Sequence, residues 1–296
     1  MDGVSTGSLR GRLTSHCLLL ELDHTLVLVD TGYGLRDVRD PASRLSRFFL
    51  TLNRPELRES MTAVRQIEAL GFAARDVRHI ILSHLDFDHA GGLDDFPHAT
   101  VHLLGDEINA ATARRTPLDR MRYRPQQWGT TRAMWEAYAP TGDRWQGFDC
   151  VRELPGVGPS VHLVPLIGHT LGHAGVAINT GARWLFYAGD AYFFHAEMDV
   201  ERPYCTPGLR AYQNMMDKDR HLRLLNQHRL RDLRRSSAGD IDIFCAHDVS
   251  EFERLAGRSH KMPVTASGGD GAPTARGARW GAPPPAHPEP APNRAP

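Results

Sequence analysis

Four side chains that commonly bind metals fall within the six-residue stretch HLDFDH that begins at His84. They are His84, Asp86, Asp88 and His89. An extended strand could not aim all four at one point, because alternate side chains of a strand face opposite ways. A loop that leaves a strand can turn the first pair one way and the second pair another. The stretch therefore predicts two neighbouring cation sites.

Comparable ligand types occur at the ends of three later apolar runs. Loops at the ends of rigid strands typically build binding sites. One such residue alone would be an ordinary loop residue, and HLDFDH alone could be a solvated acidic turn. Four such strand ends in one chain instead favour a metal centre. The three later residues are His169 after the run 161–167, Asp190 after 183–188, and His247 after 241–246.

The elements that must position these residues are mostly short strands. The runs 16–22 and 25–30 predict a hairpin, and further strands are expected at 79–83, 100–104, 161–167, 174–179, 183–188 and 241–246. Leucines and other apolar residues at helical spacing predict amphipathic helices at about 55–70 and 217–235. Because the helices fall between groups of strands, we expect sheets covered by helices.

Two segments depart from this pattern. Residues 107–150 lack strand alternation and are rich in Trp, Tyr and Met, which predicts a helical insertion. Its aromatic residues either pack within the insertion or line a substrate pocket, since such pockets are commonly apolar. Nine of the twenty prolines lie in residues 261–296, where aliphatic residues are few. That composition predicts a disordered tail.

The charge balance limits the classes of partner. Thirty-five basic and thirty-five acidic residues give a formal net charge of zero, so we expect no nucleic-acid partner and no membrane surface. The first residues lack the apolar run of a signal peptide, and no stretch reaches the roughly 18 apolar residues of a membrane span. We therefore expect a cytoplasmic protein that acts on a small-molecule substrate.

The ordered motifs LVDTG, HLDFDHAGG, GHTLGH, YAGDA and CAHD resemble those of the metallo-β-lactamase superfamily over about residues 12–250. The resemblance implies an α+β fold, an αββα sandwich formed by residues 1–260, with metals at one edge between two sheets. It also implies a role for each ligand residue: His84, Asp86 and His169 would hold a first metal, Asp88, His89 and His247 a second, and Asp190 would bridge both.

One position departs from the commoner family motif, HxHxDH. Asp86 stands where a second histidine is expected. An oxygen-rich site of this kind shifts metal preference from zinc toward iron or manganese, and the family includes iron-binding flavodiiron proteins with a carboxylate at this place. We expect two divalent ions, with Zn²⁺ as the first choice and iron or manganese as alternatives.

The expected chemistry is hydrolysis of a small ester, lactone or thioester by a metal-bound hydroxide. A metal lowers the pKa of bound water toward about 7. Asp88 is a candidate to align that hydroxide or shuttle a proton, and Tyr192, two residues after Asp190, is a candidate donor to an oxyanion. We expect His173 to support a ligand and Asp30 to support the site from the LVDTG turn.

Three alternatives remain open on the same ligands. Asp86 is compatible with an iron-dependent oxidoreductase resembling a sulfur dioxygenase. Cleavage of phosphodiesters, as by a ribonuclease, is disfavoured by the neutral charge balance. A non-catalytic scaffold is disfavoured because all seven ligand positions carry competent side chains.

Overall fold

A computed structural model of the chain describes residues 11–22, 25–151, 154–237 and 239–264. Its first sheet has the strand order β1-β2-β3-β4-β5. β1 and β2 form the predicted antiparallel hairpin, and β2 to β5 pair in parallel. The strands are β1 (Leu18–Leu22), β2 (Thr25–Val29), β3 (Val77–Ile81), β4 (Thr100–Leu104) and β5 (Trp135–Tyr138).

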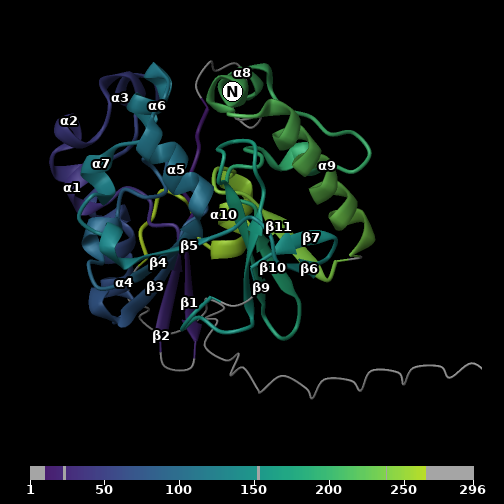
Figure 1. Cartoon of the computed structure of the whole chain (residues 1–296), viewed down its shortest axis with the longest axis horizontal. Coiled ribbons are helices and arrows are strands. Elements are labelled where there is room, and N and C mark those ends of the chain that lie inside the picture. Colours follow the sequence, from purple (N-terminus) through teal and green to yellow (C-terminus); the bar gives the residue numbers. More distant parts are fainter. Residues whose placement is uncertain (1–10, 23–24, 152–153, 238, 265–296) are drawn as a thin grey trace, which may run out of the picture.

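The second sheet has the order β11-β10-β9-β8. β10 pairs in parallel with β11 and antiparallel with β9. A separate two-stranded ribbon, β6 with β7, lies beside this sheet (Figure 1). The strands are β6 (Asp143–Trp145), β7 (Phe148–Cys150), β8 (Val161–Pro165), β9 (Ala174–Asn179), β10 (Trp184–Tyr187) and β11 (Ile241–Phe244).

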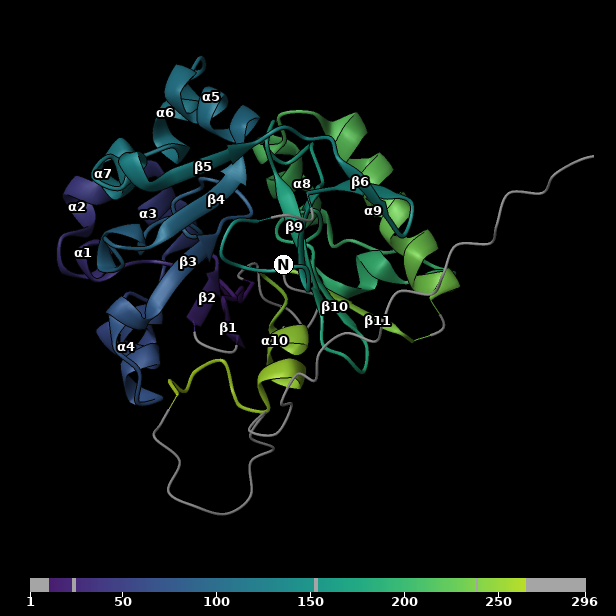
Figure 2. The same ribbon diagram turned by 60° about the horizontal axis from the view of Figure 1, so that its bottom comes forward.

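Helices cover the outer face of each sheet (Figures 1 and 2). The α-helices are α1 (Leu35–Arg39), α2 (Pro41–Arg44), α3 (Arg47–Asn53), α4 (Ala63–Ala69), α5 (Gly105–Ala113), α6 (Pro117–Arg122), α7 (Pro125–Trp128), α8 (Pro207–Met216), α9 (Arg220–Ser236) and α10 (Val249–Ala256). Of these, α4 and α5 lie outside the first sheet and α9 lies outside the second. Short 3-10 turns are η1 (Glu59–Met61), η2 (Ala74–Asp76), η3 (Leu93–Asp95), η4 (Arg132–Met134) and η5 (His195–Met198).

Three apolar cores hold these layers together. Val29 and Ile81 of the first sheet meet Val176 of the second in a core between the sheets. Ile67 of α4 packs in a core on the outer face of the first sheet, and Leu230 of α9 packs in a core on that of the second. The order helix, sheet, sheet, helix is the predicted αββα sandwich.

The sheet topology brings distant loops to one edge. Because the carboxyl ends of parallel strands meet at the same edge of a sheet, the loops after β2 and β3 start side by side, as do those after β10 and β11. These loops begin with or soon reach Asp30, His84, Asp190 and His247. The fold alone therefore gathers four of the residues on which the sequence analysis depends.

The structure departs from the sequence expectations in two places. The helix expected at 55–70 is reduced to η1 and α4, and Leu70 is 44% exposed rather than part of the buried stripe. Residues 107–150 are α-helical only as far as residue 128; after the short 3-10 turn η4 they form β5, β6 and β7. β5 is a strand because it extends the first sheet by pairing with β4.

The aromatic residues of this segment pack inside the protein. Tyr123 and Trp128 belong to the core outside the first sheet, while Trp145 and Phe148 belong to the core outside the second. Within the described ranges, no helix has the length and apolarity that crossing a bilayer requires. The tail predicted at 261–296 lies, from residue 265 onward, outside the described residues.

Candidate metal centre

The seven predicted ligands lie in one cluster at the sheet edge. Their donor atoms form three overlapping groups, and within each group the atoms lie within 4.8 Å of one another. All seven are buried except Asp88, whose side chain keeps 16% exposure. The groups are His84 with Asp86 and His169, His84 with His89 and Asp190, and Asp88 with His89 and His247.

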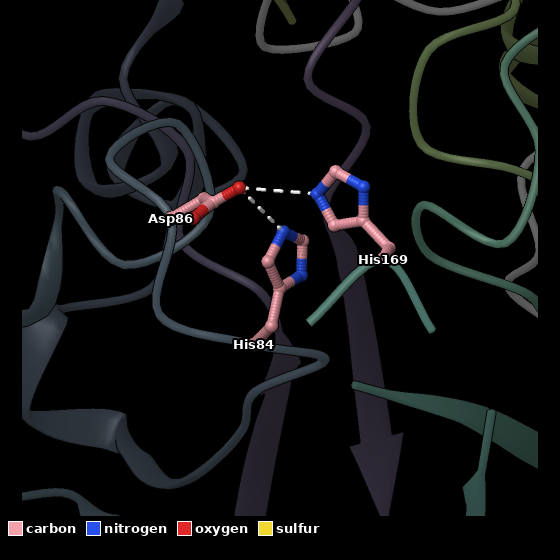
Figure 3. Close-up of side chains that lie close together, drawn as sticks. All are labelled: His84, Asp86 and His169. Atoms are coloured by element: carbon pink, nitrogen blue, oxygen red, sulfur yellow. Dashed lines mark hydrogen bonds and ion pairs between the residues drawn. The ribbon is translucent and has the colours of Figure 1, made fainter. Parts of the chain in front are cut away.

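The first group centres on one oxygen of Asp86 (Figure 3). Asp86 Oδ2 lies 3.3 Å from His84 Nε2 and 3.1 Å from His169 Nε2. Asp190 Oδ2 lies 3.3 Å from the same His169 nitrogen. Donors about 2.0–2.2 Å from a tetrahedral metal are roughly 3.3–3.6 Å apart, so these separations suit a common cation.

Asp190 of the second group also contacts donors of the other two groups. Asp190 Oδ1 lies 3.2 Å from His89 Nε2, and Asp190 Oδ2 lies 3.1 Å from His247 Nε2. Asp88 completes the third group, with one oxygen 3.9 Å from His89 Nε2 and the other 3.9 Å from His247 Nε2. Asp190 thus presents oxygens to donors of all three groups, as a bridging ligand must.

Several of the converging atoms are buried without a partner. His84 Nε2, His89 Nε2 and Asp190 Oδ1 are inaccessible and accept or donate no hydrogen bond to any residue that the structure describes. Buried polar atoms of folded proteins are nearly always partnered. Two neighbouring divalent cations, one beside His84 and one beside His89 with Asp190 between them, would give all three atoms a partner, so the donor set fits a pair of metals.

The electrostatics of the cluster favour a charged Asp190 and a neutral His169. Burial alone would raise the pKa of Asp190, but His247, His89 and His169 hold that pKa well below its usual range. Burial lowers the pKa of His169 to about 4, against the opposing effect of Asp190. His169 is therefore unprotonated at neutral pH, which is the form that binds metals.

Asp30 organises the cluster from behind. Its carboxylate accepts hydrogen bonds from the Ser83 amide, the Ser83 hydroxyl and the Tyr187 hydroxyl, each at 2.7 Å. It also lies 2.8 Å from His89 Nδ1. Because that nitrogen donates to Asp30, His89 Nε2 is left free to face the cluster. The structure thus supports the predicted role of the LVDTG turn.

Two other histidines are oriented in a similar way. His247 Nδ1 lies 2.6 Å from the Thr14 carbonyl, and His84 Nδ1 lies 2.9 Å from the Ser83 hydroxyl. His173 is different, since its Nδ1 donates to the Leu166 carbonyl at 2.9 Å and its Nε2 accepts the Asp190 amide at 2.9 Å. With both nitrogens occupied, His173 positions the loop of Asp190 rather than binding metal.

Close backbone approach explains two glycines of the motifs. A Cβ on Gly91 would lie 2.2 Å from an oxygen of Asp37, and one on Gly189 would lie 2.6 Å from His173 Nε2. Gly189 also adopts a φ of +52°, which side-chain-bearing residues rarely do. Glycine is required at both positions for the ligand loops to pass so near their supports.

The structure does not bring Tyr192 to the cluster. The residue is fully buried, its hydroxyl donates to the Glu251 carboxylate at 3.0 Å, and it does not line the cleft that holds the candidate ligands. Burial and the nearby Glu251 raise its pKa well above the ordinary value. Tyr192 faces the core because the residue belongs to the apolar cluster under α9. The oxyanion role expected of it therefore lacks geometric support.

Tyr212 of α8 is one of two tyrosines, with Tyr33, that line the cleft of the candidate ligands in the part of the chain that the structure describes. It lines the same cleft as Asp86, Asp88 and Asp190. Burial raises its pKa, and the charge of Asp88 raises it further. Sequence reasoning could not choose it, since several aromatic and histidine residues occur in the irregular segment 192–216 and no local spacing distinguishes one.

The cluster lies at the base of a cleft of about 1900 Å³. Asp88, Asp190 and His247 contribute to its floor. Its largely apolar walls come from the segments around α3, η1 and α8. None of the described residues between 107 and 150 lines it. Leu13, Phe48 and Leu52 line it while 40–48% exposed. Exposed apolar residues gathered at a cleft are typical of a ligand site.

The fold and this cluster together define a metal-dependent hydrolase of the αββα class. Residues 10–238 match the sequence model of a protein family described as the "Metallo-beta-lactamase superfamily". The chain therefore belongs to the metallo-β-lactamase superfamily and is a metallo-hydrolase.

Curated relatives agree with this assignment. The chain is 41% identical over 243 residues to the probable metallo-hydrolase Rv2300c of Mycobacterium tuberculosis, covering 81% of this chain and 76% of that protein. It has the same identity and coverage with Mb2322c of Mycobacterium bovis. An N-acyl homoserine lactonase of Bacillus thuringiensis is 33% identical over 98 residues, 33% of this chain and 39% of that protein.

Solved structures share the fold. An N-acyl homoserine lactone hydrolase with N-hexanoyl-L-homoserine bound at its catalytic metal centre superposes with a TM-score of 0.59 at 21% identity, covering 88% of this chain and 92% of that one. The dizinc lactonase AidC superposes with a TM-score of 0.51 at 18% identity, covering 79% and 72%. At these identities the likeness concerns the fold.

Proposed function

We propose that the protein hydrolyses a small ester, lactone or thioester at a centre of two divalent metals, with Zn²⁺ as the expected ion. In this proposal His84, Asp86 and His169 hold one metal, Asp88, His89 and His247 hold the other, and Asp190 bridges them. The observation that carries the proposal is the convergence of these seven donors, three of their atoms buried and unpartnered, at the base of an open cleft.

The reaction needs groups that manage protons around the reacting carbonyl. Divalent metals at these ligands would acidify water and polarise a substrate carbonyl. Asp88, the one ligand candidate whose side chain is partly exposed, can accept a proton from water and return it to the leaving oxygen. Tyr212, whose hydroxyl accepts from Asn53 at 3.2 Å, keeps its own proton to donate to an oxygen that gains charge.

The walls of the cleft favour a substrate with an apolar part. Apolar side chains extend from the ligand cluster along Phe87, Phe193 and Leu209 to the exposed Phe48 and Leu52. The volume of about 1900 Å³ exceeds the roughly 300–1000 Å³ of ordinary ligand pockets. It leaves room for an acyl chain beyond the reacting group. The names of the lactonase relatives agree with such a substrate.

The test is a substrate panel run on metal-loaded protein: acyl-homoserine lactones of increasing chain length, aryl esters and glutathione thioesters. We expect chelator-sensitive hydrolysis of at least one class, with kcat/KM rising with acyl length. Asp88→Asn should remove most of the activity, while Asp149→Asn, an exposed carboxylate on β7, serves as the matched control. Failure of every class with fully metallated protein would refute the proposal.

The iron-dependent oxidoreductase remains a distinguishable alternative. Its support is the carboxylate at Asp86, and elemental analysis of protein purified without added metal decides between the two ideas. We expect zinc. Iron at about two equivalents, with no hydrolysis, would favour the oxidoreductase instead.

A further inference from the structure

Asp86, the residue that departs from the common family motif, is paired with a buried arginine. Arg122 Nε donates to Asp86 Oδ1 at 2.7 Å, and a terminal nitrogen of the same guanidinium donates to Asp86 Oδ2 at 2.5 Å. The Arg122 side chain is 0% exposed and that of Asp86 is 3% exposed. Two parallel hydrogen bonds of this kind are the strongest arrangement available to the two groups.

The guanidinium is held against the first ligand group by other contacts. Its remaining terminal nitrogen donates to the Met216 carbonyl at 2.6 Å, at the end of α8. The nitrogen that contacts Asp86 Oδ2 also lies 3.0 Å from His169 Nε2. Arg122 is thus a fixed positive charge at the rim of the group formed by His84, Asp86 and His169.

The helix that carries Arg122 is anchored on both sides. Thr116 caps α6 through the Asp119 amide, and Asp119 in turn pairs with Lys218. The Lys218 backbone amide donates to the Gly168 carbonyl at 3.0 Å, next to His169. The position of Arg122 relative to His169 is therefore set by α6 and by the turn between α8 and α9 together.

This pairing changes what Asp86 can offer to a cation. Oδ1 accepts from Arg122 Nε, while Oδ2 accepts from the terminal Arg122 nitrogen and also lies beside the two imidazoles. Asp86 can therefore ligate through one oxygen, as a histidine does through one nitrogen. Its negative charge is matched by the adjacent guanidinium. Burial alone would raise the pKa of Asp86, but Arg122 and His84 hold it well below the usual range.

We propose that Asp86 and Arg122 act as one unit, a charge-neutral, single-oxygen ligand that replaces the histidine of the common motif. Arg122 is then a positioning residue for the first metal site. This inference rests on the proposed metal centre, and it gives the segment 107–150 a role: α6 supplies the cation that the carboxylate requires. A buried charge that loses its partner is strongly unfavourable, so either residue changed alone should impair the site.

The test places the histidine of the common motif at position 86 and compares variants that keep or lack the positive charge of Arg122. In Asp86→His, the guanidinium is left beside the metal without its partner, and we expect the affinity for the second equivalent of Zn²⁺ to fall by about 100-fold, the upper end of what disturbing the surroundings of a metal ligand typically costs. Adding Arg122→Gln should recover that affinity to within about 10-fold of wild type. Adding Arg122→Lys, which also loses the two-pronged contact but keeps the charge, should not recover it.

The readouts are zinc per chain by elemental analysis and zinc affinity by competition with a chromogenic chelator, alongside circular dichroism of each variant. If Asp86→His alone does not fold, the two double variants compared with each other carry the test. If Arg122 only stabilises the fold, adding Arg122→Gln to Asp86→His should lower the zinc affinity further. That result would overturn the inference. Equal zinc binding by the Gln and Lys double variants would do the same.

Failure of this inference is distinct from failure of the proposed function. Wild-type protein that binds no metal refutes the metal centre itself. Wild-type protein that binds two equivalents, with double variants that do not differ, leaves the centre intact and refutes only the role of Arg122.

Discussion

Asp30→Asn tests how strictly the environment of a ligand controls metal binding. The wild-type carboxylate accepts from His89 Nδ1 at 2.8 Å, from Tyr187 at 2.7 Å and from two groups of Ser83 at 2.7 Å. An asparagine can keep one acceptor toward Ser83, but its amide nitrogen would then face His89. That imidazole would have to accept at Nδ1 and carry its proton on Nε2, the atom that faces the cluster.

The size of the effect follows from that change of tautomer. Removing a hydrogen-bond partner of a metal-binding histidine typically costs about 10–100-fold in metal affinity, which is about 1.4–2.7 kcal/mol. The serine and tyrosine hydroxyls can reverse their hydrogen bonds to the amide. We therefore expect the loss to appear in the metal-loaded protein and to be small in the metal-free protein.

The assay is chelator competition for zinc, together with urea unfolding with and without EDTA. Tyr187→Phe is the control, because it removes a donor to the same carboxylate without touching His89. It should leave zinc affinity within about threefold of wild type. Zinc affinity of Asp30→Asn equal to that of wild type would refute the reasoning, as would equal destabilisation of the metal-free and metal-loaded forms.

Four further outcomes are expected. Tyr212→Phe should lower kcat/KM by about 100-fold if its hydroxyl donates to a developing charge, whereas Tyr192→Phe should leave kcat/KM nearly unchanged. Steady-state kinetics that show the reverse would assign the oxyanion role to Tyr192 instead. His173→Ala should destabilise the metal-free protein by about 1–3 kcal/mol, because the buried Asp190 amide loses its acceptor; urea unfolding that matches wild type would contradict this. Burial raises the pKa of Glu251 from 4.5 to about 7, so the folded state binds this proton more tightly than the unfolded state does. The free energy of unfolding should therefore fall as pH rises from about 4.5 to 7. Glu251→Gln should remove about 3 kcal/mol of that fall, and identical pH profiles for the variant and the wild type would contradict the assignment. Removing metal with EDTA should lower Tm by about 5–10 °C, from about 2.7 kcal/mol at metal concentrations 100-fold above Kd; an unchanged Tm would mean that no metal is bound to the folded form.

Much of the fold could be predicted because most strands are short apolar runs with clear ends. The predicted strands at 100–104 and 174–179 have the bounds of β4 and β9, and the hairpin at the start of the chain is present. The strands at 135–150 could not be predicted in the same way. β5 has half-buried and exposed residues only, and it exists because β4 offers an edge, which is a property of the assembled sheet.

The same distinction separates the parts of the site. The seven ligand candidates carry local signals, since each follows an apolar strand, and the structure gathers all of them. Arg122 carries no such signal. Its place beside Asp86 depends on the packing of α6 against the end of α8, 94 residues away along the chain. Tyr192 is the opposite case. Its proximity in sequence to Asp190 suggested an oxyanion role, but its side chain is buried in the core.

The positions of the bound ions provide a direct test of the two-metal centre. Crystals of wild-type protein grown with zinc, with anomalous diffraction data collected on both sides of the zinc absorption edge, would locate each ion. We predict two peaks about 3.5–4 Å apart, one among His84, Asp86 and His169, the other among Asp88, His89 and His247, with Asp190 between them. Zinc bound elsewhere, with these seven side chains facing no ion, would contradict it.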